Sequence, residues 1–283
     1  MFAEIIVYGT IQACVYALLA MGFTLVYGVG KILNLAHGAF YLLAGYFLFW
    51  YHKDLGLMGA AILSLVVIAI TGALSYLLLI KPLQEHEISV LLITFALGFF
   101  FEQFIRIFFD VKPHTIRSFV PGSVTFLGVK FAAQSLLVVI GSLIVVFLVG
   151  LFIKKSKLGQ SIQAVSQDRE AAMLSGINAD RMLMYTFIIS SLLAGISAIL
   201  YVPSSSIAPH MGWSILTNAF AVVVLGGLGS VKGSLIASFI LGYVNNFVVY
   251  VILPSLSAVV PITVILIVLI IRPRGLFGEK EVE

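Results

Sequence analysis

The stretch SQDREAAMLSGINADR, residues Ser166–Arg181, is a polar segment in a chain that is otherwise strongly apolar. Of the 283 residues, 61% are hydrophobic and only 10% are charged, which is far from the composition of a soluble globular domain. Apolar runs of about 20 residues, the length that crosses a bilayer as a helix, flank the segment and recur along the chain. The sequence therefore predicts an all-α, polytopic transmembrane helical bundle.

The apolar runs predict eight or nine spans, of which one or two are broken or short. The number depends on whether the short run at Ser214–Leu228 crosses fully or is re-entrant. We expect one transmembrane domain, 1–283, with a polar loop at 154–181. The predicted spans are Ile5–Tyr27, Ile32–Tyr51, Leu57–Ile80, Ile88–Phe109, Phe131–Ile153, Met182–Val202, Ser214–Leu228, Gly233–Leu253 and Ser257–Ile271.

The charges of the loop at 154–181 predict the orientation of the chain in its membrane. Basic residues outnumber acidic ones in this loop, so the positive-inside rule makes it cytoplasmic. Nine crossings then put the N-terminus outside and the C-terminus in the cytoplasm, whereas a re-entrant Ser214–Leu228 would leave the tail RPRGLFGEK outside. The basic residues are Lys154, Lys155, Lys157, Arg169 and Arg181, against Asp168, Glu170 and Asp180.

Several classes of function are excluded by missing motifs. The single cysteine, Cys14, lies in the first apolar run, so no disulfide framework or metal-type Cys/His spacing is present. We find no nucleophile–base pair or paired carboxylates for an enzyme. The stretch YGVGKIL, Tyr27–Leu33, has isoleucine where a phosphate-binding loop needs Ser or Thr. We therefore expect no enzyme activity, no bound cofactor or metal and, with a net charge of only +4, no nucleic-acid partner.

The polar segment predicts a short helix with capping residues at both ends. Asp168 can accept a hydrogen bond from free backbone N–H groups of a helix that begins at Arg169, and Glu170 favours the positive end of its dipole. Gly176 can end the helix in a left-handed conformation. Asn178 or Asp180 can then cap the membrane helix that follows.

Two small residues, Ala171 and Ala172, lie in the middle of this predicted helix. Small side chains let a helix lie deep in the groove of a partner protein. The alternative is a capped helix that rests on the lipid headgroups, and periodicity alone favours this alternative.

The residue types of the segment support the first interpretation, a helix that lies in the groove of a partner protein. EAAMLSG, Glu170–Gly176, reads E-A-A-x-x-x-G and resembles the cytoplasmic loop signature of ABC-importer permeases. Most of the chain is similar to the LivH/LivM branch of that family, the permeases of branched-chain amino acid importers, and its short beginning is most like the LivH type. The stretches that carry the resemblance are NLAHGAFYLLAGY, ISVLLITFALGFFFEQ, GINADRMLMYTFIISSLLAGISAIL, FAVVVLGGLGSVKGSLIASFILG and RPRGLFG.

The resemblance implies a transport subunit that works with partner proteins. The polar segment would be a coupling helix in the groove of one of two ATPase subunits, which would bind the ATP and Mg. A second, LivM-like permease would complete a heterodimer, and an extracytoplasmic binding protein would deliver leucine, isoleucine or valine. The implied ATPase-coupling residues are Asp168, Glu170, Ala171, Ala172, Gly176, Asp180 and Arg181.

Other substrates and another class of transporter stay open at this point. Relatives in this branch handle other amino acids, urea or small amides and aromatic acids. A self-sufficient secondary transporter driven by an ion gradient would also have broken helices, with Glu102 as its proton-linked group.

Two glycine-rich stretches interrupt the helical pattern in the two halves of the chain. YGVGKILNLAHGAF, Tyr27–Phe40, and LGGLGSVKGSL, Leu225–Leu235, each stand before a new apolar run. Interrupted helices in a transporter indicate a substrate path, because unwound backbone needs protein or water beside it. The alternative is two ordinary loops between helices.

Ionisable and amide side chains within the spans are the remaining candidates. Glu102 and Arg106 stand four residues apart on one predicted helix and can form an intramembrane ion pair. A contact with a zwitterionic amino acid is the alternative for this pair. The candidate translocation path, whose members could instead tie helices together, consists of Asn34, His37, Thr94, Asn218, Asn245 and Asn246.

Overall fold

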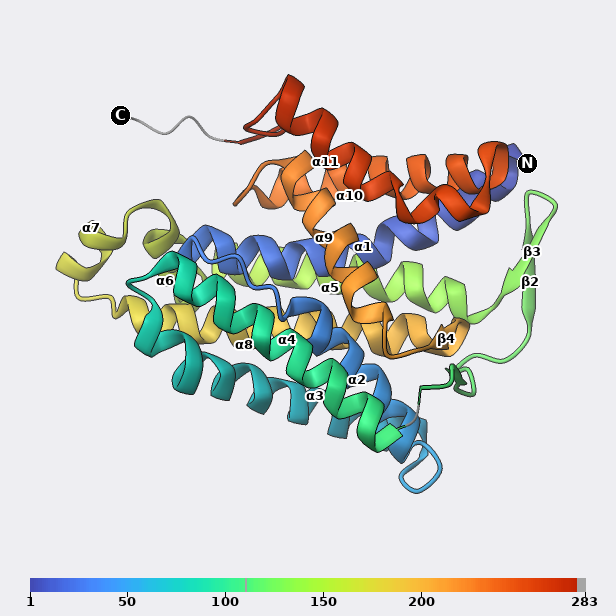
Figure 1. Ribbon diagram of the computed structural model, residues 1–283, viewed down its shortest axis with the longest axis horizontal. Coiled ribbons are helices and arrows are strands. Elements are labelled where there is room, and N and C mark those ends of the chain that lie inside the picture. Colours follow the sequence, from blue (N-terminus) through green and yellow to red (C-terminus); the bar gives the residue numbers. More distant parts are fainter. Residues whose placement is uncertain (110, 279–283) are drawn as a thin grey trace.

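A computed structural model describes residues 1–109 and 111–278, and it confirms an all-α helical bundle (Figure 1). Among these described residues, six helical segments are long and apolar enough to cross a membrane, and Met211–Gly226 and Val260–Ile271 are shorter apolar helices. Helix α7 (Arg169–Leu174), from the polar loop, lies at one end of the long axis, and the N-terminus lies at the other. Lys280, one of the basic residues near the C-terminus, lies outside the described residues.

The helices follow the predicted spans closely, with differences at the ends. Segment 131–133 belongs to a strand and its turn instead of a helix, and the loop at 154–181 contains a helix, α6, that the sequence did not predict. The helices are α1 (Phe2–Gly30), α2 (His37–Tyr51), α3 (Gly56–Leu74), α4 (Glu87–Phe109), α5 (Gln134–Lys155), α6 (Lys157–Gln167), α7 (Arg169–Leu174), α8 (Ala179–Tyr201), α9 (Met211–Gly226), α10 (Val231–Phe247) and α11 (Val260–Ile271).

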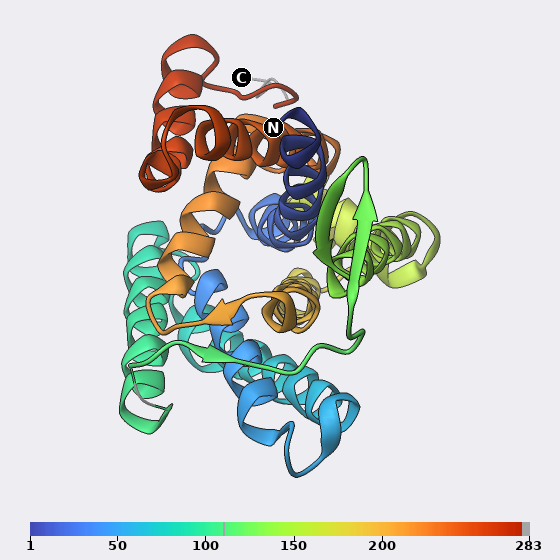
Figure 2. The ribbon, with the colours of Figure 1, turned by 90° about the vertical axis from the view of Figure 1, so that its right-hand side faces the viewer.

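Helix α1 forms the centre of the bundle. In its apolar window 83% of the residues are buried, against 11% for α5 at the periphery. Both windows are apolar, so hydropathy alone does not tell a central helix from one that faces lipid. Helices α5, α8, α9 and α10 pack around α1, and Figure 2 shows α9 between α4 and α11 on one side of the bundle.

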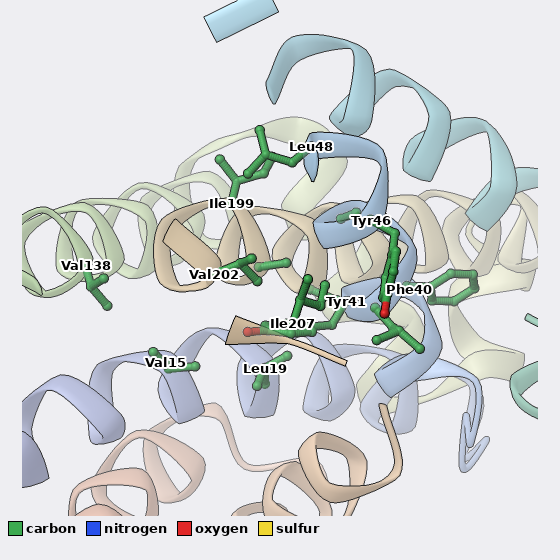
Figure 3. Close-up of a cluster of buried hydrophobic side chains, with 14 of the residues drawn as sticks. Val15, Leu19, Phe40, Tyr41, Tyr46, Leu48, Val138, Ile199, Val202 and Ile207 are labelled. Carbon is green, nitrogen blue, oxygen red and sulfur yellow. The ribbon is translucent and has the colours of Figure 1, made fainter. Parts of the chain in front are cut away.

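The largest buried cluster joins α1, α2 and α8 (Figure 3). Leu19 of α1 lies near Tyr41 of α2, with Ile207 from a short strand beside them, and Tyr46 packs on the other side of α2 against Phe109. Close packing of this kind holds α2 at a fixed depth in the bundle, because lipid and protein interiors are equally apolar and association in a membrane depends on fit.

The first predicted interruption is a broken helix. Helix α1 ends at Gly30, Lys31 takes a left-handed conformation with φ 53°, and α2 begins only at His37. The non-helical residues between them include Ile32, Asn34 and Ala36, whose side chains are all buried. The predicted span Ile32–Tyr51 is therefore an unwound entry followed by a helix of 15 residues.

The second interruption lies at a different place from the prediction. Residues 227–230 form a short turn between α9 and α10. The non-helical stretch that leads into α9 is instead Ser205–His210, within which Ile207, Ala208 and Pro209 are buried. Helices α2 and α9 approach each other closely at this point. A side chain on Gly38 of α2 would collide with the carbonyl oxygen of Gly212 of α9.

Four short strands lie at the end of the bundle that carries the N-terminus. β1 (His114–Thr115) pairs antiparallel with β4 (Ser206–Ile207), and β2 (Ser123–Phe126) pairs antiparallel with β3 (Val129–Ala132). The β1–β4 pair ties the α4–α5 connection to the unwound stretch before α9. The strands thus fix the entry of α9 into the bundle.

Candidate functional site

The polar loop at 154–181 folds as two short helices with the predicted caps. The Asp168 carboxylate accepts a hydrogen bond from the backbone N–H of Ala171 at 3.0 Å, and the side chain of Asn178 caps α8 by accepting from the N–H of Arg181 at 2.9 Å. Gly176 ends the short helix with φ +84°, a conformation that L side chains rarely adopt. The capped helix predicted from the sequence is confirmed.

The two alanines of this helix face opposite ways. Ala172 is buried against Ile162 and Val165 of α6, whereas Ala171 is exposed. Glu170 is exposed too, and Leu174 is 90% exposed. Of the two alanines, only Ala171 is free to face a partner.

Asp180 links the loop to neighbouring segments at the same end of the bundle. Its carboxylate receives Arg169 at 3.2 Å and the amide of Gln84 at 3.3 Å, and the Lys81 ammonium lies 3.8 Å away. Lys81 and Gln84 stand between α3 and α4, so the α7 region is joined to two membrane helices. Arg181, the last of the seven predicted coupling residues, is exposed.

A small cavity lies inside the bundle where α2, α4 and α9 meet. Leu35 and Ala39 line it from the start of α2, Gly98 and Glu102 from α4, and Gly212 and Trp213 from the first turn of α9. Its free space is about 10 Å³, which is room for one water molecule. None of the six predicted path residues lines this cavity.

Glu102 and Arg106 form the predicted ion pair, with 2.5 Å between Arg106 Nη2 and Glu102 Oε1. The Glu102 side chain is 6% exposed and that of Arg106 39%. The second carboxylate oxygen, Oε2, is buried and has no hydrogen-bond partner among the described residues. A buried carboxylate oxygen without a partner is unusual, since buried polar groups nearly always have partners.

Asn34, His37 and Thr94 are brought together around the unwound entry to α2. Thr94 of α4 accepts a hydrogen bond from the N–H of Leu35 at 3.3 Å, and Asn34 accepts from the N–H of Ala36 at 3.1 Å. His37 is fully buried and bridges α1 and α8: Nε2 donates to the Leu19 carbonyl at 3.0 Å, and the Ser190 hydroxyl lies 3.2 Å from Nδ1. These contacts make all three residues part of the support for the broken helix.

The other three predicted path residues lie elsewhere. Asn246 of α10 donates to Gln12 of α1 at 2.6 Å, and Asn245 donates to Tyr16 at 3.4 Å, so both belong to the α1–α10 contact. Asn218 lies on α9, apart from the other five predicted path residues, and its side-chain amide donates to the carbonyl of Ser214 at 2.8 Å. Whether any of the six contacts a substrate stays a prediction.

The family model for the branched-chain amino acid transport system permease component matches residues 5–269. The chain belongs to this family. It is 29% identical to the BraD branched-chain amino acid permease of Pseudomonas aeruginosa, over 100% of this chain and 97% of that protein. It is 26% identical to LivH of Escherichia coli, over 97% and 95%, and 26% identical to a probable LivH of Methanocaldococcus jannaschii, over 92% and 88%.

These relatives make the chain an ABC-importer permease of the LivH type and a multi-pass inner-membrane protein. Among solved structures, the chain resembles PsaBC from Streptococcus pneumoniae, with a TM-score of 0.52 and 14% identity over 97% of both chains. This likeness supports the fold alone. Within the described residues, no group of three or more His, Cys, Asp or Glu side chains is placed to hold a metal ion.

Proposed function

We propose that the chain is the non-catalytic permease subunit of an ATP-driven importer of leucine, isoleucine and valine. Two separate ATPase subunits supply the energy, a LivM-like permease completes the pore, and an extracytoplasmic binding protein delivers the substrate. The observation that carries the proposal is the full-length similarity to branched-chain amino acid permeases, together with a cytoplasmic helix that presents Glu170, Ala171 and Leu174.

The orientation in this proposal has the loop at 154–181 in the cytoplasm and the N-terminus outside. The arrangement of the ends supports it, because α7 and the N-terminus lie at opposite ends of the bundle (Figure 1). The basic residues Lys154, Lys155 and Lys157 are at the α7 end, in agreement with the positive-inside rule.

The alternative is an ion-coupled secondary transporter that needs no partner. Uptake into proteoliposomes separates the two functions. We expect ATP-dependent leucine uptake only when the chain is reconstituted with the second permease, both ATPases and the binding protein. Leucine uptake by the chain alone, driven by an ion gradient, would establish the alternative and refute the proposal.

Substitution of exposed residues tests the ATPase contact directly. Leu174→Asp puts a charge where an apolar side chain is expected to be buried by the ATPase, and Glu170→Ala removes the exposed carboxylate of the same helix. We expect both variants to lose ATPase co-purification and uptake. Leu127→Asp is the matched control for ATPase binding, since Leu127 is 59% exposed at the β2–β3 turn, at the other end of the bundle. If both α7 variants bind ATPase as the wild type does, the coupling role of α7 is wrong.

A further inference from the structure

The cavity between α2, α4 and α9 combines three features that together indicate a ligand. The oxygen Oε2 of Glu102 is buried and has no partner among the described residues, while Oε1 is held by Arg106. The first turn of α9, with Gly212 and Trp213, also lines this cavity. The free space beside them is about the size of one water molecule.

We propose that Glu102 binds the α-ammonium group of the amino acid substrate at this cavity, which rests on the proposed function. The free oxygen accepts hydrogen bonds, and a charge-assisted bond to –NH₃⁺ is among the strong ones. An ammonium group is close to water in size, so it fits the free space, whereas a whole amino acid does not. The carbon skeleton and the carboxylate therefore lie at the mouth of the cavity.

The start of α9 supplies the complementary charge. The first turn of an α-helix leaves backbone N–H groups without intrahelical partners, and the positive end of the helix dipole favours an anion. Half-helix N-termini inside transporters face substrate carboxylates in the same way. The site thus selects a zwitterion, and a zwitterion adds no net charge beside the Glu102–Arg106 pair.

Arg106 acts as a positioning residue in this arrangement. Its guanidinium fixes one oxygen of the carboxylate and leaves the other free for the cavity. Without a counter-ion, a buried carboxylate is expensive in the membrane. The ion pair therefore keeps a charged hydrogen-bond acceptor inside the membrane while no substrate is bound.

The chain provides its own probe for this site. It has two tryptophans, and Trp213 lines the cavity, where its ring lies 5.2 Å from that of Phe95 between centroids. In a Trp50→Phe background, the fluorescence of Trp213 in the full chain in nanodiscs reports binding. The probes are L-leucine, 4-methyl-2-oxopentanoate, which lacks the ammonium group, and isopentylamine, which lacks the carboxylate.

We expect leucine to change the Trp213 fluorescence saturably, with the keto acid and the amine requiring at least about tenfold higher concentrations, as for the loss of one charge-assisted hydrogen bond. Glu102→Gln should raise the half-saturating leucine concentration at least about tenfold and remove the preference for leucine over the keto acid. Glu87→Gln, at an exposed position on the same helix, is the matched control and should leave the titration unchanged.

The double variant Glu102→Gln/Arg106→Gln removes both charges and guards against a simple loss of folding. If this variant or Glu102→Gln folds and titrates with leucine within about twofold of the wild type, the proposal is overturned. A wild-type titration without any saturable change would overturn it as well. These outcomes leave the proposed function standing as long as the assembled complex takes up leucine with ATP, and only failure of that uptake refutes the function.

Discussion

Among the described residues, two carboxylate–arginine pairs lie at different depths, and their surroundings differ sharply. Asp180 is 35% exposed at the α7 end of the bundle and is shared by Arg169, Lys81 and Gln84. Glu102 is nearly buried inside the bundle, has Arg106 as its partner and keeps one oxygen unpaired. The Asp180 carboxylate thus has three described partners, whereas the Glu102 carboxylate has one. The first arrangement suits a mechanical link, and the second suits a binding site.

The largest effect is expected for Arg106→Gln. This change leaves the Glu102 carboxylate, 6% exposed, without its partner, and an unsatisfied buried charged group costs more than the about 1–3 kcal/mol of a neutral one. Denaturant titration of the purified chain in nanodiscs measures the free energy of unfolding. The double variant Glu102→Gln/Arg106→Gln should recover most of the loss. Equal stability of Arg106→Gln and wild type would contradict the importance of the buried pair.

The next effect concerns the backbone beside the buried pair. Gly38→Ala places a methyl group on the carbonyl oxygen of Gly212, so α2 and α9 must separate, and overpacking costs about 1–3 kcal/mol. Two matched changes bracket this result in the same titration. Gly212→Ala should be milder, because the added carbon would lie 3.4 Å from the Gly38 oxygen, and Gly150→Ala should be nearly neutral, because nothing lies within 4 Å. A Gly38→Ala chain as stable as Gly150→Ala would refute the close contact.

Sequence patterns predicted the polar loop at 154–181 better than the interior of the bundle. The caps at Asp168 and Asn178 and the stop at Gly176 are local devices, so their residue types reveal them before any packing is known. Helix α6 was missed although Ile162 and Val165 repeat at helical spacing, because Lys157–Gln167 is too polar to be noticed as a span. The ends of the membrane helices were also predicted less closely, because polar residues there weaken the apolar pattern.

The cavity could not be predicted because it depends on contacts between distant segments. Glu102 and Arg106 were predicted as a pair from their spacing. The unpaired oxygen of Glu102 and the turn of α9 that lines the cavity follow only from the packing of α2, α4 and α9. A local signal was present before α9, where Pro203, Pro209 and Gly212 interrupt the helical pattern. The Gly-rich turn at 225–235 gave a stronger local signal, so the second interruption was wrongly predicted there.

The smallest effect on stability is expected for Asp180→Asn. Exposed ion pairs contribute only about 0.2–1 kcal/mol, so the free energy of unfolding should change little. Transport should respond more strongly, because the change weakens the link from Arg169 to Lys81 and Gln84 that joins α7 to α3 and α4. The measurement is the ratio of leucine imported to ATP hydrolysed by the reconstituted complex, which should fall although ATPase subunits still bind. Asp54→Asn, at an exposed position between α2 and α3, is the control and should keep the ratio. If Asp180→Asn keeps the wild-type ratio as well, the surface pair is no mechanical link, and its contrast with the buried pair is one of exposure alone.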